Sequence, residues 1–309
     1  MGNYNGFRGN KWLENRIEIF KEYVLPSLIR QGSENFYIWF QWRPEEKENP
    51  IVKKFQRFLD VVIGIYAVHT FGGITFYDDK YEDKEARERL MKSLEVSLPQ
   101  LKAHVGDFPY VLLTIQPSDD MYLNFAAKKL QSEFAKKIEE GVERVAIGWK
   151  KGYIINYWTK EVAEYNTYEG WRVDGTSAYL TGTIPPFFTI LFPSDVFLDP
   201  QKHFNHIGPY KTHEDIKNVM DYEEMPGKGY IVGCHGENIS TTFTRRYKGR
   251  MLFPGERDEL FVSVGILNAP LIDFVPSFRY RVRKFVNRLP FNWIIKTIYH
   301  RIPNKYKII

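Results

Sequence analysis

The pattern of hydrophobic and polar positions along this chain predicts a fold in which helices alternate with strands. Apolar residues recur every three or four positions, the spacing of one helix face, in 13–24, 51–62, 83–104 and 122–138. Short apolar runs bounded by Pro, Gly or Asp predict strands at 35–42, 110–115, 187–192 and 230–234. This alternation is typical of an α/β domain built on a central sheet.

Proline and glycine refine two of these elements. Pro26 predicts a kink or break late in the first helix, because proline lacks a backbone donor. The run Lys150-Lys151-Gly152 predicts a turn that joins two strands, 144–149 and 153–158, in a hairpin.

The second half of the chain has a different texture. From residue 166 onwards Gly, Pro, Thr and aromatic residues replace the helical periodicity. His203 and His206 are therefore expected in irregular chain. His213, Glu214 and Asp215 are expected to open a short helix, with the acids in its first turn.

Two adjacent carboxylates, Asp119 and Asp120, stand where the strand at 110–115 ends and before the helix at 122–138. In open α/β sheets ligands bind at this end of the strands. An acid here can cap the helix and complement its dipole. A pair of acids can also hold Mg²⁺ or Mn²⁺ together with a diphosphate, because these cations prefer one or two carboxylates plus phosphate oxygens and water.

Charge is unevenly distributed along the 309 residues. The net charge is +5, but residues 274–309 carry nine Lys or Arg and no acid, which leaves 34 basic against 38 acidic residues elsewhere. Phe, Tyr and Trp interleave with these basic residues, and an interfacial membrane anchor has this mixture. The alternative is that the apolar residues of the tail pack on the main domain. The single cysteine, Cys234, excludes an internal disulfide and suits a reducing compartment.

Three segments resemble the rhamnosyltransferase family of GT-A-type glycosyltransferases. Residues 16–31 with 36–39 are similar to the opening of that family, and residues 118–121, Ser-Asp-Asp-Met, resemble its metal motif. Residues 229–241, which contain His235-Gly236-Glu237-Asn238, resemble its late His-Gly-x-Asn segment. The family usually has a further acid two positions before the acidic pair, where this chain has Pro117.

The resemblance implies a GT-A-like mixed central sheet flanked by helices. It implies a glycosyltransferase domain over 1–273, with a nucleotide-sugar half at about 1–148 and a looser acceptor half at about 149–273. The basic aromatic tail is then 274–309. The implied cofactor is Mn²⁺ or Mg²⁺, the implied donor substrate a nucleotide-diphosphate sugar, and rhamnose is the sugar that the family name suggests.

Site residues follow from the same resemblance, each beside a simpler explanation. Asp119, Asp120 and His235 are the expected metal or diphosphate ligands, although backbone groups of a loop could also satisfy a histidine at 235. Glu214 or Asp215, with His213 as a further choice, is the expected general base, although such acids also complement a helix dipole. The residues expected to contact the nucleotide and its phosphates are Arg8, Arg16, Asp119, Asn238 and Ser240. Solvated surface is the simpler expectation for Arg16, and an ordinary polar turn is the alternative for Asn238 and Ser240.

The expected partners are thus a nucleotide sugar and a glycan or lipid-linked acceptor, in the cytoplasm or at the inner face of an anionic membrane. Two other functions compete with this one. A metal hydrolase could use Asp119, Asp120, His206 and His235, although no two histidines have the i, i+4 spacing of a zincin. A nucleic-acid-binding protein could use the basic tail, although the rest of the chain is acidic.

Overall fold

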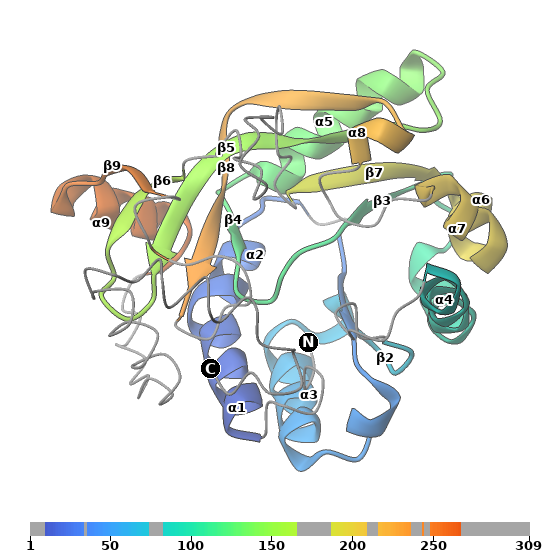
Figure 1. Cartoon of the computed structure of the whole chain (residues 1–309), viewed down its shortest axis with the longest axis horizontal. Coiled ribbons are helices and arrows are strands. Elements are labelled where there is room, and N and C mark those ends of the chain that lie inside the picture. The colour runs from blue at the N-terminus through green and yellow to red at the C-terminus, as the bar shows by residue number, and fades with distance from the viewer. Residues whose placement is uncertain are drawn as a thin grey trace, which may run out of the picture.

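The computed structural model describes residues 10–33, 36–73, 83–165, 187–208, 216–235, 243 and 248–266. In these residues helices flank a curled mixed sheet (Figure 1), which confirms the prediction of a mixed α/β fold. Arg8, His213, Glu214, Asp215, Asn238, Ser240 and the basic tail lie outside the described residues.

The N-terminal third forms a helical layer and a small parallel sheet. Its elements are α1 Asn10–Ile19, the π-helical turn η2 Phe20–Val24, α2 Leu25–Ile29, β1 Ile38–Gln41, the 3₁₀ turn η3 Pro44–Glu46, α3 Pro50–Val62, the 3₁₀ turn η4 Gly64–Tyr66 and β2 Ala67–Thr70. The irregularity predicted near Pro26 takes the form of η2. Pro26 follows directly after this turn, in the first turn of α2, and the chain is helical on both sides of it.

The remaining elements build the larger sheet and the helices that cover it. They are α4 Asp83–Val105, β3 Tyr110–Thr114, β4 Met121–Tyr122, α5 Ala126–Glu139, β5 Ala146–Asn156, β6 Val162–Tyr165, β7 Phe188–Pro193, α6 Ser194–Leu198, α7 Pro200–Ile207, α8 Ile216–Val219, β8 Tyr222–Cys234, β9 Lys248–Met251 and α9 Pro254–Ser263. α3 and α7 begin as their sequences suggest: the side chains of Asn49 and Asp199 accept from backbone N–H groups of the first turn, and proline follows each.

The strands form two sheets within the described residues. β1 and β2 make a two-stranded parallel sheet. The larger sheet has the order β3-β7-β5-β6-β9, and β8 pairs in parallel with β5 and antiparallel with β4. The β5–β8 pairing runs through position 148, where the sequence suggested a boundary between two halves.

Three sequence-based expectations about elements are wrong. Residues 146–156 form the single strand β5 instead of a hairpin, because pairing with β8 continues past Lys151 through two register shifts. The acidic pair leads into the short strand β4, and the helix starts only at Ala126. His203 and His206 lie on α7, not in irregular chain.

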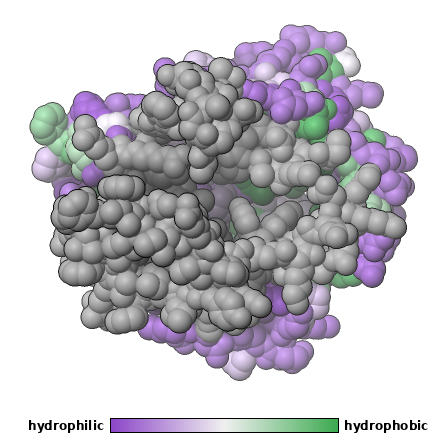
Figure 2. Space-filling model, viewed as in Figure 1, coloured by the Kyte–Doolittle hydropathy of each residue, from purple (hydrophilic) through white to green (hydrophobic). Residues whose placement is uncertain are grey.

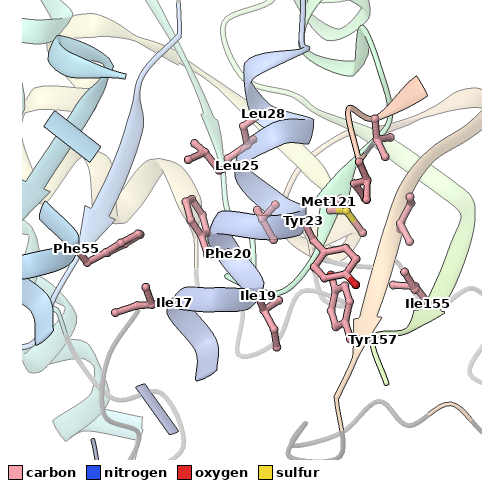
Figure 3. Close-up of a cluster of buried hydrophobic side chains, with 14 of the residues drawn as sticks. Ile17, Ile19, Phe20, Tyr23, Leu25, Leu28, Phe55, Met121, Ile155 and Tyr157 are labelled. Atoms are coloured by element: carbon pink, nitrogen blue, oxygen red, sulfur yellow. The ribbon is translucent and has the colours of Figure 1, made fainter. Parts of the chain in front are cut away.

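Helices pack on both faces of the larger sheet. α5 covers one face through Leu130 and Phe134, which belong to the same buried cluster as Ile147 and Trp149 of β5. α4, α6 and α7 gather with β7 in a second cluster. A third cluster joins α1, η2, α2 and α3 to Met121, Ile155 and Tyr157 (Figure 3).

The described residues at the surface are mainly hydrophilic on the face that Figure 2 shows, with hydrophobic side chains in small separate areas. Within the described ranges, none of the helices combines the length and the apolar character that crossing a membrane requires.

Candidate functional site

The acidic pair closes a turn, residues 116–120, that we call the acidic turn. β3 ends at Thr114, the Asp120 N–H donates to the carbonyl of Pro117 (3.2 Å), and the side-chain amide of Gln116 donates to the carbonyl of Asp120 (2.7 Å). β4 follows at once and pairs with β8, Met121 opposite Ile231. Local bonds and strand pairing together therefore fix where Asp119 and Asp120 lie.

Asp119 is buried and lies between two basic groups. One of its carboxylate oxygens, Oδ2, forms an ion pair with the Arg16 guanidinium and accepts a hydrogen bond from Nε2 of His235 (3.0 Å). Only 6% of the residue is exposed. Burial acts to raise the pKa of Asp119, but Arg16 and His235 outweigh it and hold that pKa well below its usual range.

Asp120 is also buried but has a different environment. Its Oδ1 accepts a hydrogen bond from the backbone N–H of Gly233 (2.8 Å), and its Oδ2 accepts none from the described residues. Burial and then the negative charge of Asp119 raise the pKa of Asp120 well above its usual range. The two neighbours therefore differ: one is a stabilised anion, and the other is a carboxyl group whose charged form is disfavoured by burial and by the charge of Asp119.

β8 and the end of β5 hold the backbone of the acidic turn. The hydroxyl of Tyr157 donates to the Asp119 carbonyl (2.6 Å). A Cβ added to Gly233 would lie 2.0 Å from that same carbonyl oxygen, so only glycine permits this approach. Tyr157 is in turn fixed by the ring of Tyr23, whose centre lies 4.5 Å away (Figure 3).

Arg16 lies inside the protein, where the sequence suggested solvated surface. It is 9% exposed, and its guanidinium carbon lies 5.1 Å from the ring centre of Trp12, one turn earlier on α1. Helical spacing places both residues on the face of α1 that packs against the sheet. The ion pair with Asp119 compensates for the burial of the arginine charge.

The structure thus brings together Arg16, Asp119, Asp120 and His235. His206 is not part of this group: its Nε2 bonds to the carbonyl of Leu191 (2.7 Å) and its ring packs on Phe192. His203 bonds to the carbonyl of Phe197 in the same way (2.8 Å). His203 is buried and His206 is half-buried, and both bond to backbone carbonyls, so a hydrolase built on the acidic pair would not have His206 as a ligand.

Tyr157 and Gly233 are parts of the site that the sequence reading missed. Gly233 stands inside an apolar strand, and an isolated glycine there signals close approach of another backbone. That signal was present in the sequence. Nothing in the spacing around Tyr157 points to its bond with Asp119, because the two residues meet only through the tertiary fold.

A cation fits this arrangement in one way. In the described part of the chain, no group of three or more His, Cys, Asp or Glu side chains is placed to hold a metal ion. Asp119 and His235 are engaged with each other, and Oδ2 of Asp120 is a carboxylate oxygen that accepts no hydrogen bond from the part of the chain that the structure describes. Mg²⁺ and Mn²⁺ bind through one or two carboxylates when phosphate oxygens and water supply the other ligands.

A cavity of about 520 Å³ lies beside the acidic turn. Gln116, Pro117 and Ser118 line one part of it, and β1, β3, the end of α4 and the start of α5 supply most of the other walls. The acidic turn thus has β8 and β5 on one side and a cavity on the other.

Comparison of the chain with known protein families, with curated proteins and with solved structures finds no match.

Proposed function

We propose that this chain is a metal-dependent glycosyltransferase of the GT-A type. It would move a sugar from a nucleotide-diphosphate donor to a hydroxyl of a glycan or lipid-linked acceptor. The family that the sequence resembles suggests rhamnose as that sugar. One observation carries the proposal. In the turn between β3 and β4, Asp120 has a carboxylate oxygen that accepts no hydrogen bond from the described residues, and it lies beside an Asp119 that pairs with Arg16 and His235.

Each residue of the site has a separate role in this proposal. Arg16 and His235 fix and neutralise Asp119, so that a second carboxylate can be buried next to it. The Gly233 N–H holds the side chain of Asp120, and the Tyr157 hydroxyl holds the backbone carbonyl of Asp119. Asp120 would then meet the cation and diphosphate through Oδ2. A bound Mn²⁺ or Mg²⁺ supplies positive charge to the departing nucleotide diphosphate.

The other assignments remain part of the proposal. His213, Glu214 and Asp215 are the candidates for the base that takes the acceptor proton, and Arg8, Asn238 and Ser240 for phosphate contacts. The tail at 274–309 would hold the enzyme at the inner face of an anionic membrane, since each basic residue near such a surface adds about 1 kcal/mol.

Calorimetry tests the binding step on the full chain. Uridine, thymidine, guanosine and cytidine diphosphates would each be titrated with Mn²⁺ and again with excess chelator. We expect at least one to bind with Mn²⁺ and to lose most of its affinity when the cation is removed. The proposal fails if no diphosphate binds in the presence of Mn²⁺, or if the affinity is the same with and without the chelator.

A further inference from the structure

The cavity beside the acidic turn runs along the edges of two strands. It touches three consecutive residues of β1, Ile38, Trp39 and Phe40, and all five residues of β3. Successive side chains of a strand point to opposite faces of the sheet. A cavity that touches successive residues of both strands therefore lies between their edges and not over one face.

Hydrogen bonds at the β3–β7 pair show which backbone groups of β3 face this cavity. The Ser194 N–H donates to the carbonyl of Pro109 (3.0 Å), and the Leu191 N–H donates to the carbonyl of Val145, just before β5, instead of to Leu112, its partner in register. In an antiparallel ladder this makes Val111 and Leu113 the residues bonded to β7. Leu112 and Thr114 turn their N–H and C=O groups away from β7, toward β1.

The same reasoning applies to β1. The Trp42 N–H donates to the carbonyl of Thr70 (2.8 Å), so residue 42 faces β2. Backbone groups alternate along a strand, so Phe40 also faces β2, whereas Trp39 faces the cavity. No backbone hydrogen bond between β1 and β3 occurs in the described residues.

The walls that the structure describes carry no permanently charged side chain. The described residues that line the cavity are mostly aromatic and aliphatic, and none is Asp, Glu, Lys or Arg. A diphosphate would find no Lys or Arg among these described residues, and His104 is their one imidazole. Unpaired backbone groups in such surroundings are costly, and a strand edge is a template for another strand.

We propose that the space between β1 and β3 binds an extended peptide segment with uncharged side chains, which adds a strand and joins the two sheets. A peptide backbone supplies donors and acceptors at the spacing that both edges require, and its apolar side chains suit the uncharged walls. β3 offers five residues, about 16 Å of strand, to such a partner. This peptide site is independent of the proposed transferase activity, because it uses the backbone of β1 and β3 and not the carboxylates.

Amide hydrogen exchange followed by NMR on the full chain tests the proposal, with controls on the same strands. In the free protein the amides of Leu112, Thr114 and Trp39 should exchange at least tenfold faster than those of Val111, Leu113 and Phe40. The probe is acetyl-Val-Thr-Val-Thr-Val-Thr-amide, a neutral strand-forming peptide. At millimolar concentration it should slow the three open-edge amides at least tenfold.

Two control peptides sharpen the test. Proline in place of the central valine removes a ladder donor, and lysine in place of each threonine adds charge; both should leave the open-edge amides unprotected. The proposal is overturned if Leu112, Thr114 and Trp39 already exchange slowly in the free protein, because β1 and β3 are then paired without a partner. It is also overturned if the neutral peptide protects none of them.

Discussion

The two sides of the acidic turn are built differently. On the side of β8 and β5, the Gly233 N–H and the Tyr157 hydroxyl bond to it, and glycine permits contact between backbones. On the side of β1 the turn meets a cavity, and the edges of β1 and β3 are not joined by backbone hydrogen bonds in the described residues. Contacts with β8 and β5 can place the carboxylates accurately, whereas the part of the turn that faces the cavity is Gln116, Pro117 and Ser118.

The largest effect should come from removing the charge that neutralises Asp119. Arg16→Met keeps an apolar side chain of similar length but leaves a buried carboxylate without its cation, which should cost about 3–5 kcal/mol of unfolding free energy. Lys136→Met removes a cation from an exposed ion pair with Glu133 and should cost less than about 1 kcal/mol. Urea denaturation of both variants checks the difference. Equal losses would mean that the Arg16–Asp119 pair is not an important buried contact.

The same pair predicts how the stability difference depends on pH. The pKa of Asp119 is lower in the folded protein than its ordinary value, so its contribution is present above that value and is lost as the pH falls through the folded pKa. The gap in unfolding free energy between wild type and Arg16→Met should therefore be widest near neutral pH and shrink below about pH 4. A gap that widens in acid would contradict the assignment of Asp119 as the stabilised anion.

The sequence predicts features that depend on neighbouring residues better than features that depend on residues far apart in the chain. The helix α3 was predictable because Asn49-Pro50 and the apolar spacing are local signals. The hairpin prediction at 150–152 failed because Gly152 permits close approach of β8 and does not form a turn. A Cβ at this position would lie 2.7 Å from the backbone oxygen of Tyr230 on β8. Long-range pairing with β8 decided the strand, and local turn chemistry did not.

The site shows the same limit. The place of the acidic pair followed from the abrupt end of β3, and His235 was expected nearby. Its contact with Asp119, and the burial of Arg16, depend on α1, β3 and β8 meeting in the fold. The spacing of residues along the chain does not show which elements contact each other, so the different environments of Asp119 and Asp120 could not be predicted.

An intermediate effect on stability is expected where the backbone of Gly233 contacts the backbone of the acidic turn. Gly233→Ala would force a Cβ against the Asp119 carbonyl and should cost about 1–3 kcal/mol, because backbone atoms cannot move aside cheaply. Gly255→Ala is the control: it lies in α9 with nothing within 4 Å of the added Cβ, and should stabilise by about 0.5–1 kcal/mol. Thermal unfolding compares the two. A neutral Gly233→Ala would show that the acidic turn is free to shift away from β8.

Tyr157→Phe should have the smallest effect on stability, together with a specific effect on ligand binding. Tyr157→Phe and Tyr230→Phe each remove one phenol-to-carbonyl hydrogen bond, to Asp119 and to Lys150 respectively, at a cost of about 1 kcal/mol. Only Tyr157→Phe loosens the acidic turn, so it alone should weaken the binding of Mn²⁺ with a nucleoside diphosphate. Equal affinity in the two variants would show that the Tyr157 bond plays no part in positioning the carboxylates.

The central claim is that Asp120 presents the open carboxylate oxygen of a neutralised pair to a cation and its diphosphate. Electron paramagnetic resonance tests it directly, since the six-line spectrum of free Mn²⁺ broadens when the ion is bound. In the presence of the nucleoside diphosphate that calorimetry selects, wild type and the exposed control Asp107→Asn should deplete the free Mn²⁺ signal equally. Asp120→Asn should leave most of that signal in place. Depletion by Asp120→Asn as strong as that by wild type would contradict the account.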